Sequence, residues 1–162
     1  MYNYYQEDSG HFQPYLLRNK NQTNPSLQMD FGPQPNILDV KKATMNNQNY
    51  RTALWTGDHL QLTVMSIPPQ EDIGLEIHPD VDQFLYIIDG TGIVKMWDRK
   101  DHFNIQQLVF EDDAIIIPAG TWHNVTNVGK NDLKLFSIYG PANHPWGSVH
   151  QTKEIAESMG NH

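Results

Sequence analysis

Short segments of alternating apolar and polar residues follow one another through most of this chain, separated by turn residues. Such alternation is typical of β-strands that bury one face. The turn chemistry is strong at joints such as Asp89-Gly90 and Pro118-Ala119-Gly120. We expect strands within residues 36–42, 50–57, 59–69, 73–79, 83–89, 92–98, 103–111, 114–119, 122–128 and 133–140. Many short, closely spaced strands with almost no helix signal predict an all-β sandwich or barrel.

The composition divides the chain into three parts. Residues 1–36 are rich in Asn, Gln, Tyr and Pro and show no period that would bury a face. We expect them to form an irregular N-terminal extension, either disordered or folded only against another surface. Residues 37–150 are expected to form the β-barrel domain. Residues 151–162 are expected to form a short C-terminal helix or tail, with Ile155 and Met159 one turn apart and Gly160 as the terminator.

Charge and composition exclude several classes of partner. The formal net charge of -8 disfavours a nucleic acid, since binding to phosphates relies on clustered Lys and Arg. No apolar run approaches the roughly 18 residues that a membrane span needs, and the opening lacks the features of a signal peptide, so we expect a cytoplasmic protein without a membrane partner. The absence of Cys excludes disulfides, thiolate ligands and Cys nucleophiles.

Two segments carry side chains that could bind a metal ion. Glu76 and His78 are two residues apart, so on a strand they share one face. A short loop then returns the chain, and Gln83 opens the next strand. His123 follows the turn at Gly120, which lets the chain re-enter the barrel with the imidazole pointing inward. A carboxylate, an amide oxygen and two imidazoles can thus converge from separate segments.

These segments resemble the two sequence motifs of the cupin superfamily, whose members are small jelly-roll barrels. The spacing of the first motif is matched by Glu76, His78, Gln83 and Gly90, and that of the second by Asp112, Pro118, Gly120, His123 and Asn127. The resemblance covers about residues 50–142. It implies a cupin-type jelly-roll β-barrel and places the family's metal site at Glu76, His78, Gln83 and His123.

Three positions depart from the family pattern. Glu76 stands where the family has His, Gln83 where it has Glu, and Asp112 where it has Gly. The first two changes together conserve the formal charge of the site. Two imidazoles and one carboxylate suit a divalent Mn, Fe, Ni or Zn ion. The alternative is an ion-free pocket in which His78 and His123 hydrogen-bond to the other two side chains.

Within the superfamily, the resemblance implies several functions. The leading hypothesis is a metal-dependent isomerase, epimerase or lyase, similar to sugar-phosphate-isomerase-like cupins, acting on a sugar, sugar phosphate, or hydroxy or keto acid. In it, Glu76 or Asp82 would move a proton and Tyr86 would offer a hydroxyl group. Asp82 is alternatively a turn cap, and Tyr86 a packing residue. The other hypotheses are a non-catalytic ligand-binding or structural cupin and a non-haem metal dioxygenase.

Oligomerisation is expected because a barrel of this kind leaves exposed edge strands. A two-fold homodimer is a common way to cover such edges. The segment from Ile37 to Lys42, expected as a strand, is the candidate for reaching the second subunit.

Overall fold

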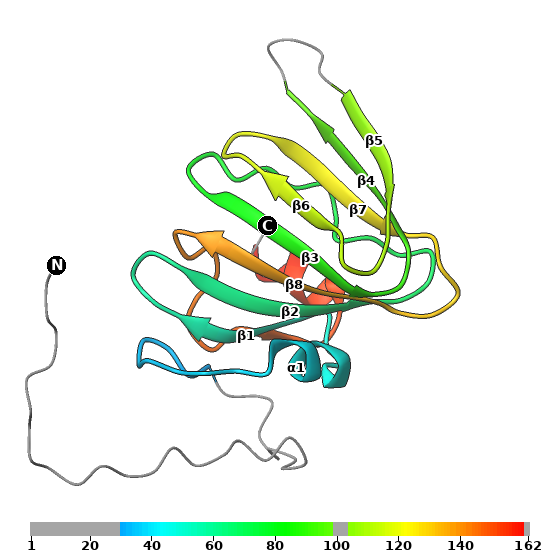
Figure 1. Ribbon diagram of the computed structural model, residues 1–162. Helices are drawn as coiled ribbons and strands as arrows, with labels where there is room; N and C mark the ends of the chain where they lie inside the picture. Colours follow the sequence, from blue (N-terminus) through cyan, green and yellow to red (C-terminus); the bar gives the residue numbers. More distant parts are fainter. Residues whose placement is uncertain (1–29, 99–103, 161–162) are drawn as a thin grey trace, which may run out of the picture.

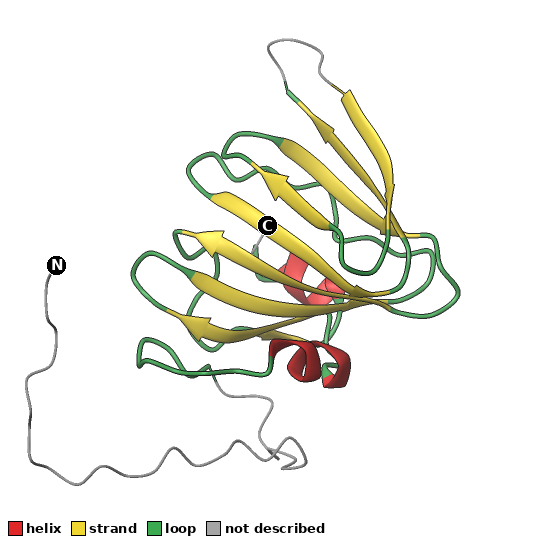
Figure 2. Cartoon of the chain, viewed as in Figure 1, coloured by secondary structure: helices red, strands yellow, loops and turns green. Residues whose placement is uncertain are grey.

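Two antiparallel β-sheets form the body of the protein in the computed structural model, which describes residues 30–98 and 104–160 (Figure 1). The larger sheet has the strand order β6-β3-β8-β2-β1-β9, and the smaller sheet has the order β5-β4-β7. The strands are β1 (Arg51–Thr56), β2 (Gln61–Ile67), β3 (Asp82–Asp89), β4 (Gly92–Trp97), β5 (Asn104–Val109), β6 (Ala114–Ile117), β7 (Trp122–Asn127), β8 (Leu133–Gly140) and β9 (Val149–His150). Strands predominate over helices in the described part of the chain (Figure 2). The all-β jelly-roll prediction is confirmed.

The core lies between the two sheets and follows from the alternation along each strand. In β3, Leu85 and Ile87 face inward and are fully buried, whereas Phe84 and Tyr86 face outward. Leu85 packs in one cluster with residues of both sheets, among them Val94 of β4 and the other core residues Met65, Val109, Ile115, Val125, Leu133 and Leu135. This shared cluster joins the two sheets into one β-barrel.

The interior of the barrel is apolar at one end and polar at the other. Along β8 the inward residues change from Leu133 and Leu135 to Ser137 and Tyr139. The same change occurs between Val125 and His123 on β7, and between Leu85 and Gln83 on β3, where Gln83 is the register partner of Tyr139. Because neighbouring antiparallel strands change character at matching positions, the polar side chains meet at one end. This end contains the candidate site.

The segment predicted to enter the barrel as a strand is helical instead. Residues 36–42 were expected to be a strand, but α1 spans Val40–Asn46. The side chain of Asp39 caps this helix by accepting a hydrogen bond from the Lys42 backbone N–H at 3.1 Å. Ala43 then packs with Leu54 and Val64 on the outer face of the larger sheet. The strand prediction was wrong. The N-cap hydrogen bond of Asp39 and the packing of Ala43 on the sheet stabilise a helix here, and together they outweigh the weak strand propensity of this segment.

Residues 30–36 form an irregular segment that is held against the barrel. Asp30 is buried, and its carboxylate accepts hydrogen bonds from the Gly32 N–H, the Thr56 hydroxyl and the Gly147 N–H at 2.6–3.0 Å. The Phe31 N–H donates to the carbonyl of Leu54. The remainder of the expected N-terminal extension, residues 1–29, lies outside the described residues.

The expected C-terminal helix is present, although it is short. Helix α2 spans Lys153–Ser158 after the two-residue strand β9 and ends before Gly160, whose φ of +70° is the left-handed conformation expected of a terminator. Its buried residue is Ala156, while Met159 is 62% exposed. No helix in the described part of the chain is long and apolar enough to cross a membrane.

Candidate metal centre

Glu76 and His123 are joined by their backbones, although they are far apart in the sequence. The Glu76 N–H donates to the His123 carbonyl at 3.0 Å, and the His123 N–H donates to the Glu76 carbonyl at 2.9 Å. Within the predicted strand 73–79, the structure forms this isolated β-bridge and no regular strand, and a second bridge lies just before the segment, at Asp72. The bridge between Glu76 and His123 fixes the carboxylate beside the imidazole that β7 presents.

The loop before β7 is tied to the segment that carries His78. The Gly120 N–H donates to the His78 carbonyl at 2.8 Å, and the Ala119 N–H donates to the Asp82 carboxylate at 2.8 Å. Gly120 has a φ of +78°, a conformation that favours glycine. The turn predicted at Pro118-Ala119-Gly120 therefore positions both histidines relative to each other.

Three ligand atoms converge at the polar end of the barrel. Glu76 Oε2 lies 3.4 Å from His78 Nε2 and 3.6 Å from His123 Nε2. Each of the three residues has a ligand atom within 4.8 Å of the ligand atoms of the other two. All three side chains are at most 4% exposed. A carboxylate and two imidazoles at this separation could hold a metal ion.

The tautomer of His123 fits metal binding. Its Nδ1 lies 3.0 Å from the Thr121 carbonyl oxygen, which can only accept a hydrogen bond. A neutral ring with its proton on Nδ1 would offer the Nε2 lone pair to a bound ion, whereas in the ion-free site the same Nε2 faces the Glu76 carboxylate at 3.6 Å. Histidine ligands in proteins are commonly oriented by such a hydrogen bond from the second ring nitrogen. Within the described residues, none of Glu76 Oε2, His78 Nε2 and His123 Nε2 makes a standard hydrogen bond, so all three are available to an ion.

Glu76 is held in its charged form by its surroundings. Burial alone would raise the pKa of this carboxyl, but the imidazoles of His123 and His78 and the guanidinium of Arg51 outweigh burial and lower the pKa well below its usual range. Arg51 Nη2 donates to Glu76 Oε1 at 3.2 Å. One carboxylate oxygen therefore faces Arg51 while the other faces the two histidines.

Gln83 lies at the same end of the barrel, and its amide is oriented by β8. Its Nε2 donates to the Ser137 hydroxyl at 3.0 Å. Its Oε1 has no hydrogen-bond partner among the described residues although the side chain is buried. An amide oxygen presented in this way is chemically suited to serve as a neutral metal ligand.

Two of the predicted catalytic residues are not part of this group. Asp82 is exposed on β3, where its carboxylate accepts the hydrogen bond from the Ala119 N–H and so acts as a turn cap. Tyr86 lies on the outer face of β3, stacks on Phe136 and donates its hydroxyl hydrogen bond to Asp112. Successive residues of a strand point to opposite faces, so the inward position of Gln83 directs Asp82 and Tyr86 outward.

Arg51 was missed by the sequence reasoning. It is the first residue of β1, where it pairs with Met65, and its buried guanidinium reaches Glu76; Ala53 is buried two positions further on. A signal was present in the sequence, because Arg51 shares the strand face of an inward apolar residue in RTALWT. A charged residue in that register indicates a buried ion pair or a binding site.

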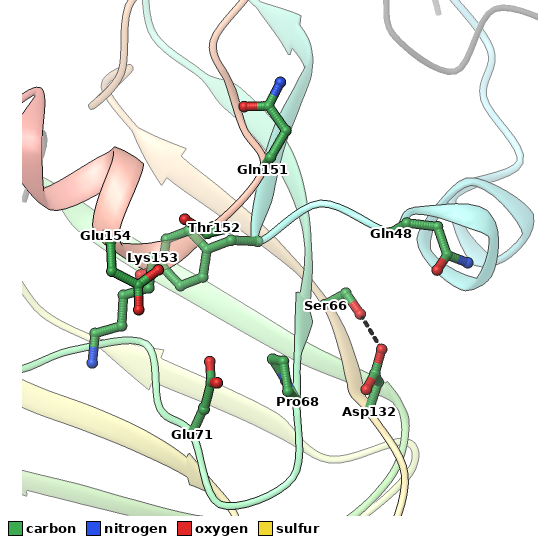
Figure 3. A pocket seen from close by; sticks show the side chains of 10 residues that line it. Gln48, Ser66, Pro68, Glu71, Asp132, Gln151, Thr152, Lys153 and Glu154 are labelled. Carbon is green, nitrogen blue, oxygen red and sulfur yellow. Dashed lines mark hydrogen bonds between the residues drawn. The ribbon is translucent and has the colours of Figure 1, made fainter.

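A cavity of about 150 Å³ lies elsewhere, between α2, the end of β2 and the loops near them (Figure 3). Its lining includes Glu71, Asp132 and Lys153, but none of the three converging residues. The Ser66 hydroxyl donates to Asp132 at 2.9 Å, and Lys153 pairs with Asp72. Within the described residues, none of the buried polar atoms without a partner belongs to its lining. This cavity is therefore a weaker candidate for a functional site than the polar end of the barrel.

A small jelly-roll barrel with imidazole and carboxylate groups gathered in its interior defines the cupin class of proteins. The family described as "Cupin domain" matches residues 63–139, which include every residue of the converging group. The chain belongs to the cupin family.

Proteins from two bacilli are similar to this chain over most of its length. The chain is 56% identical over 140 residues to the uncharacterized protein YrkC of Bacillus subtilis, a match that covers 86% of this chain and 75% of that protein. The crystal structure of BH2720 from Bacillus halodurans is 55% identical, covers 80% of this chain and 98% of that chain, and superposes with a TM-score of 0.78. The similarity to this crystal structure supports the fold over most of the described residues.

A more distant relative has a named activity. The acireductone dioxygenase of Emericella nidulans is 30% identical over 83 residues, a match that covers 51% of this chain and 45% of that protein. The chain therefore spans less than half of this relative.

Proposed function

We propose that the protein is a metal-dependent cupin enzyme that acts on a small, oxygen-rich substrate. Its metal ligands are Glu76, His78 and His123, with the Gln83 amide oxygen as the fourth. The observation that supports this most directly is the convergence of Glu76 Oε2 with two imidazole Nε2 atoms that lack other partners in the described chain. The reaction we propose is an isomerisation, epimerisation or lyase reaction of a sugar, a sugar phosphate or a hydroxy or keto acid.

The chemistry of the site follows from its donor set. Two neutral imidazoles, a carboxylate and an amide oxygen suit Mn, Fe, Ni or Zn as the divalent ion. When bound, such an ion supplies Lewis acidity toward substrate oxygens. Glu76 binds in its charged form, and Arg51 and the Thr121 carbonyl hold Glu76 and His123 in place. The buried position of all three ligand residues keeps bulk water away from the reacting groups.

Elemental analysis tests the metal site directly. The protein is purified without a His-tag or chelator, beside a His78→Ala, His123→Ala double variant and a His59→Ala control, whose histidine is exposed. We expect near-stoichiometric metal in the parent and the control and none in the double variant. If no ion binds to the parent even after incubation with Mn, Fe, Ni and Zn salts, the enzyme proposal is overturned and a non-catalytic ligand-binding cupin takes its place.

A second candidate function is a non-haem metal dioxygenase. It is favoured by the similarity to acireductone dioxygenase and by a ligand set of two histidines and a carboxylate. The two candidates differ in whether O₂ is consumed. Oxygen uptake by the metal-loaded protein with an acireductone as substrate would support the dioxygenase, whereas turnover of a substrate in anaerobic buffer would support the isomerase or lyase.

A further inference from the structure

Arg51 places a permanent positive charge inside the barrel. The side chain is 1% exposed, and a guanidinium stays protonated at any ordinary pH. Burying a charge is costly unless the group is paired and hydrogen-bonded. The groups that contact Arg51 therefore indicate which kind of ligand this part of the barrel interior can bind.

The contacts of Arg51 leave much of its hydrogen-bonding capacity unused. Nη2 donates to Glu76 Oε1 at 3.2 Å, while Nε and Nη1 have no hydrogen-bond partner among the described residues. A guanidinium carries five N–H donors. One carboxylate contact at 3.2 Å is thus a small part of what this side chain can bind.

Arg51 is also held in position. Its guanidinium carbon lies 5.1 Å from the centroid of the Tyr50 ring, a cation–π distance. The Tyr50 hydroxyl donates to the Ile73 carbonyl at 2.6 Å, which fixes the ring. The free donors of Arg51 are therefore preorganised, which lowers the entropic cost of binding a ligand.

The charges at the polar end of the barrel favour an anion. His78, His123 and Gln83 bind metals as neutral groups, and the one carboxylate, Glu76, is already shared with Arg51. With a divalent ion in the group, the side chains carry no net negative charge to offset it. An anionic ligand would supply that charge and would also occupy the unused donors of Arg51.

We propose that Arg51 binds the carboxylate of a small α-hydroxy or α-keto acid, whose other oxygen faces the group formed by Glu76, His78 and His123. This inference rests on the function proposed for the same site and narrows its substrate to acids. A neutral sugar would leave the buried Arg51 donors unpaired, which costs binding free energy.

Two probes of the same shape and different charge test the proposal. Glycolate carries a carboxylate, and glycolamide replaces it by a neutral amide. Isothermal titration calorimetry measures both with metal-loaded and metal-free protein, and elemental analysis gives the metal content of every sample. We expect the parent to bind glycolate about 10- to 100-fold more tightly than glycolamide, since hydrogen bonds to charged groups are the stronger ones.

Variants of Arg51 separate its role from that of the metal ligands. Arg51→Gln should lose this preference and bind both probes with similar affinity, and Arg51→Lys should retain part of it because the charge remains. Lys134→Gln is the control: Lys134 is another buried cation, bound to the Asn47 carbonyl at 2.6 Å, and its removal should leave the preference unchanged.

Each outcome decides one of the two proposals. A parent that binds metal but prefers glycolate no more than glycolamide overturns the Arg51 proposal alone, as does a metal-loaded Arg51→Gln variant that keeps the preference. If the parent binds no metal, the enzyme proposal is overturned. Glycolate binding by that metal-free protein, lost in Arg51→Gln, would still support Arg51 as the residue that binds a carboxylate. If neither Arg51 variant folds, the comparison of the two probes on the parent decides. Binding of inorganic phosphate in place of glycolate would overturn the assignment to a carboxylate.

Discussion

His144 is a buried histidine that the candidate metal centre does not use. It packs edge-on against Tyr139 with ring centroids 5.1 Å apart, and its backbone N–H donates to Gln61 at 2.9 Å. Burial, followed by the positive charge of Arg51, lowers the pKa of His144 to about 3 from its ordinary value of 6.5. The folded protein therefore holds this ring neutral.

Acid should destabilise the fold through His144. Between pH 6.5 and about 3, the unfolded chain binds one proton more at this position than the folded protein, so its contribution to stability is complete above pH 6.5 and is lost as the pH falls toward 3. From pH 7 to pH 4.5, we predict that the parent loses on the order of 2 kcal/mol more of its free energy of unfolding than the His144→Gln variant does. Urea denaturation at both pH values in the presence of a chelator measures it. An equal pH dependence of parent and variant would contradict the prediction, and His59→Gln, at an exposed position, is the control.

At the scale of single residues, sequence reasoning located the group that could hold a metal ion but not its counter-charge. The spacing of Glu76, His78 and His123 in two motifs was sufficient to bring them together. Arg51 belongs to neither motif, and its contact with Glu76 depends on how β1 is placed beside the segment 73–79. Asp112 illustrates a substitution that the backbone tolerates: it adopts a φ of +70° where the family has Gly, a conformation that Asp enters more readily than most residues.

At the scale of elements, strands were easier to predict than the segments that cover them. Alternation and turn residues located β1 to β8 to within a few residues. The segment 73–79 has the same alternation, but the structure forms no regular strand there and joins the segment to the barrel through single backbone hydrogen bonds and an isolated bridge at Glu76. Helix α1, which packs on the outside, was not predicted because its structure depends on contacts with the finished barrel. For residues 30–36 the sequence indicated an irregular segment but left open whether it folds against another surface.

Asp30 should be the main attachment point of the segment 30–36. Its carboxylate accepts three hydrogen bonds in a buried position, and Asp30→Ala would leave the Gly147 N–H and the Thr56 hydroxyl without this acceptor. We predict a loss of about 2–4 kcal/mol in the free energy of unfolding, measured by urea denaturation. Asp58→Ala, at an exposed turn position, should change the stability by less than about 0.5 kcal/mol. Equal effects of the two substitutions would show that the segment contributes little.

At the scale of the whole molecule, the larger sheet has an apolar outer face near its edge. Ile116 on the edge strand β6 is 69% exposed and is the register partner of Phe84 on β3. Phe84, Tyr86 and Phe136 form a row of neighbouring rings across β3 and β8. Part of the segment from Ile37 to Lys42, which was expected to reach a second subunit as a strand, belongs to helix α1 instead. The apolar outer face of the larger sheet is therefore the better candidate for a dimer interface.

We predict a homodimer through this face, because pairing two copies would bury the exposed Ile116 and the half-buried rings of Phe84 and Tyr86 and would cover the edge of β6. Light scattering should give twice the mass of one chain for the parent. Ile116→Lys should shift the mass toward that of a single chain, whereas Leu60→Lys, in the turn between β1 and β2, should not. A parent of single-chain mass would contradict the dimer, and an Ile116→Lys variant of unchanged mass would contradict the choice of face.

The deep burial of Glu76, His78 and His123 has a consequence for how the protein acquires an ion. Side chains this inaccessible exchange a coordinated ion with solvent more slowly than a surface site does, because several buried ligands must release the ion together. An ion enclosed during folding would therefore leave slowly, and the metal found in the purified protein would reflect the supply in the compartment where the chain folded. Expression in media that differ only in their metal salts would then yield proteins of different content from one sequence.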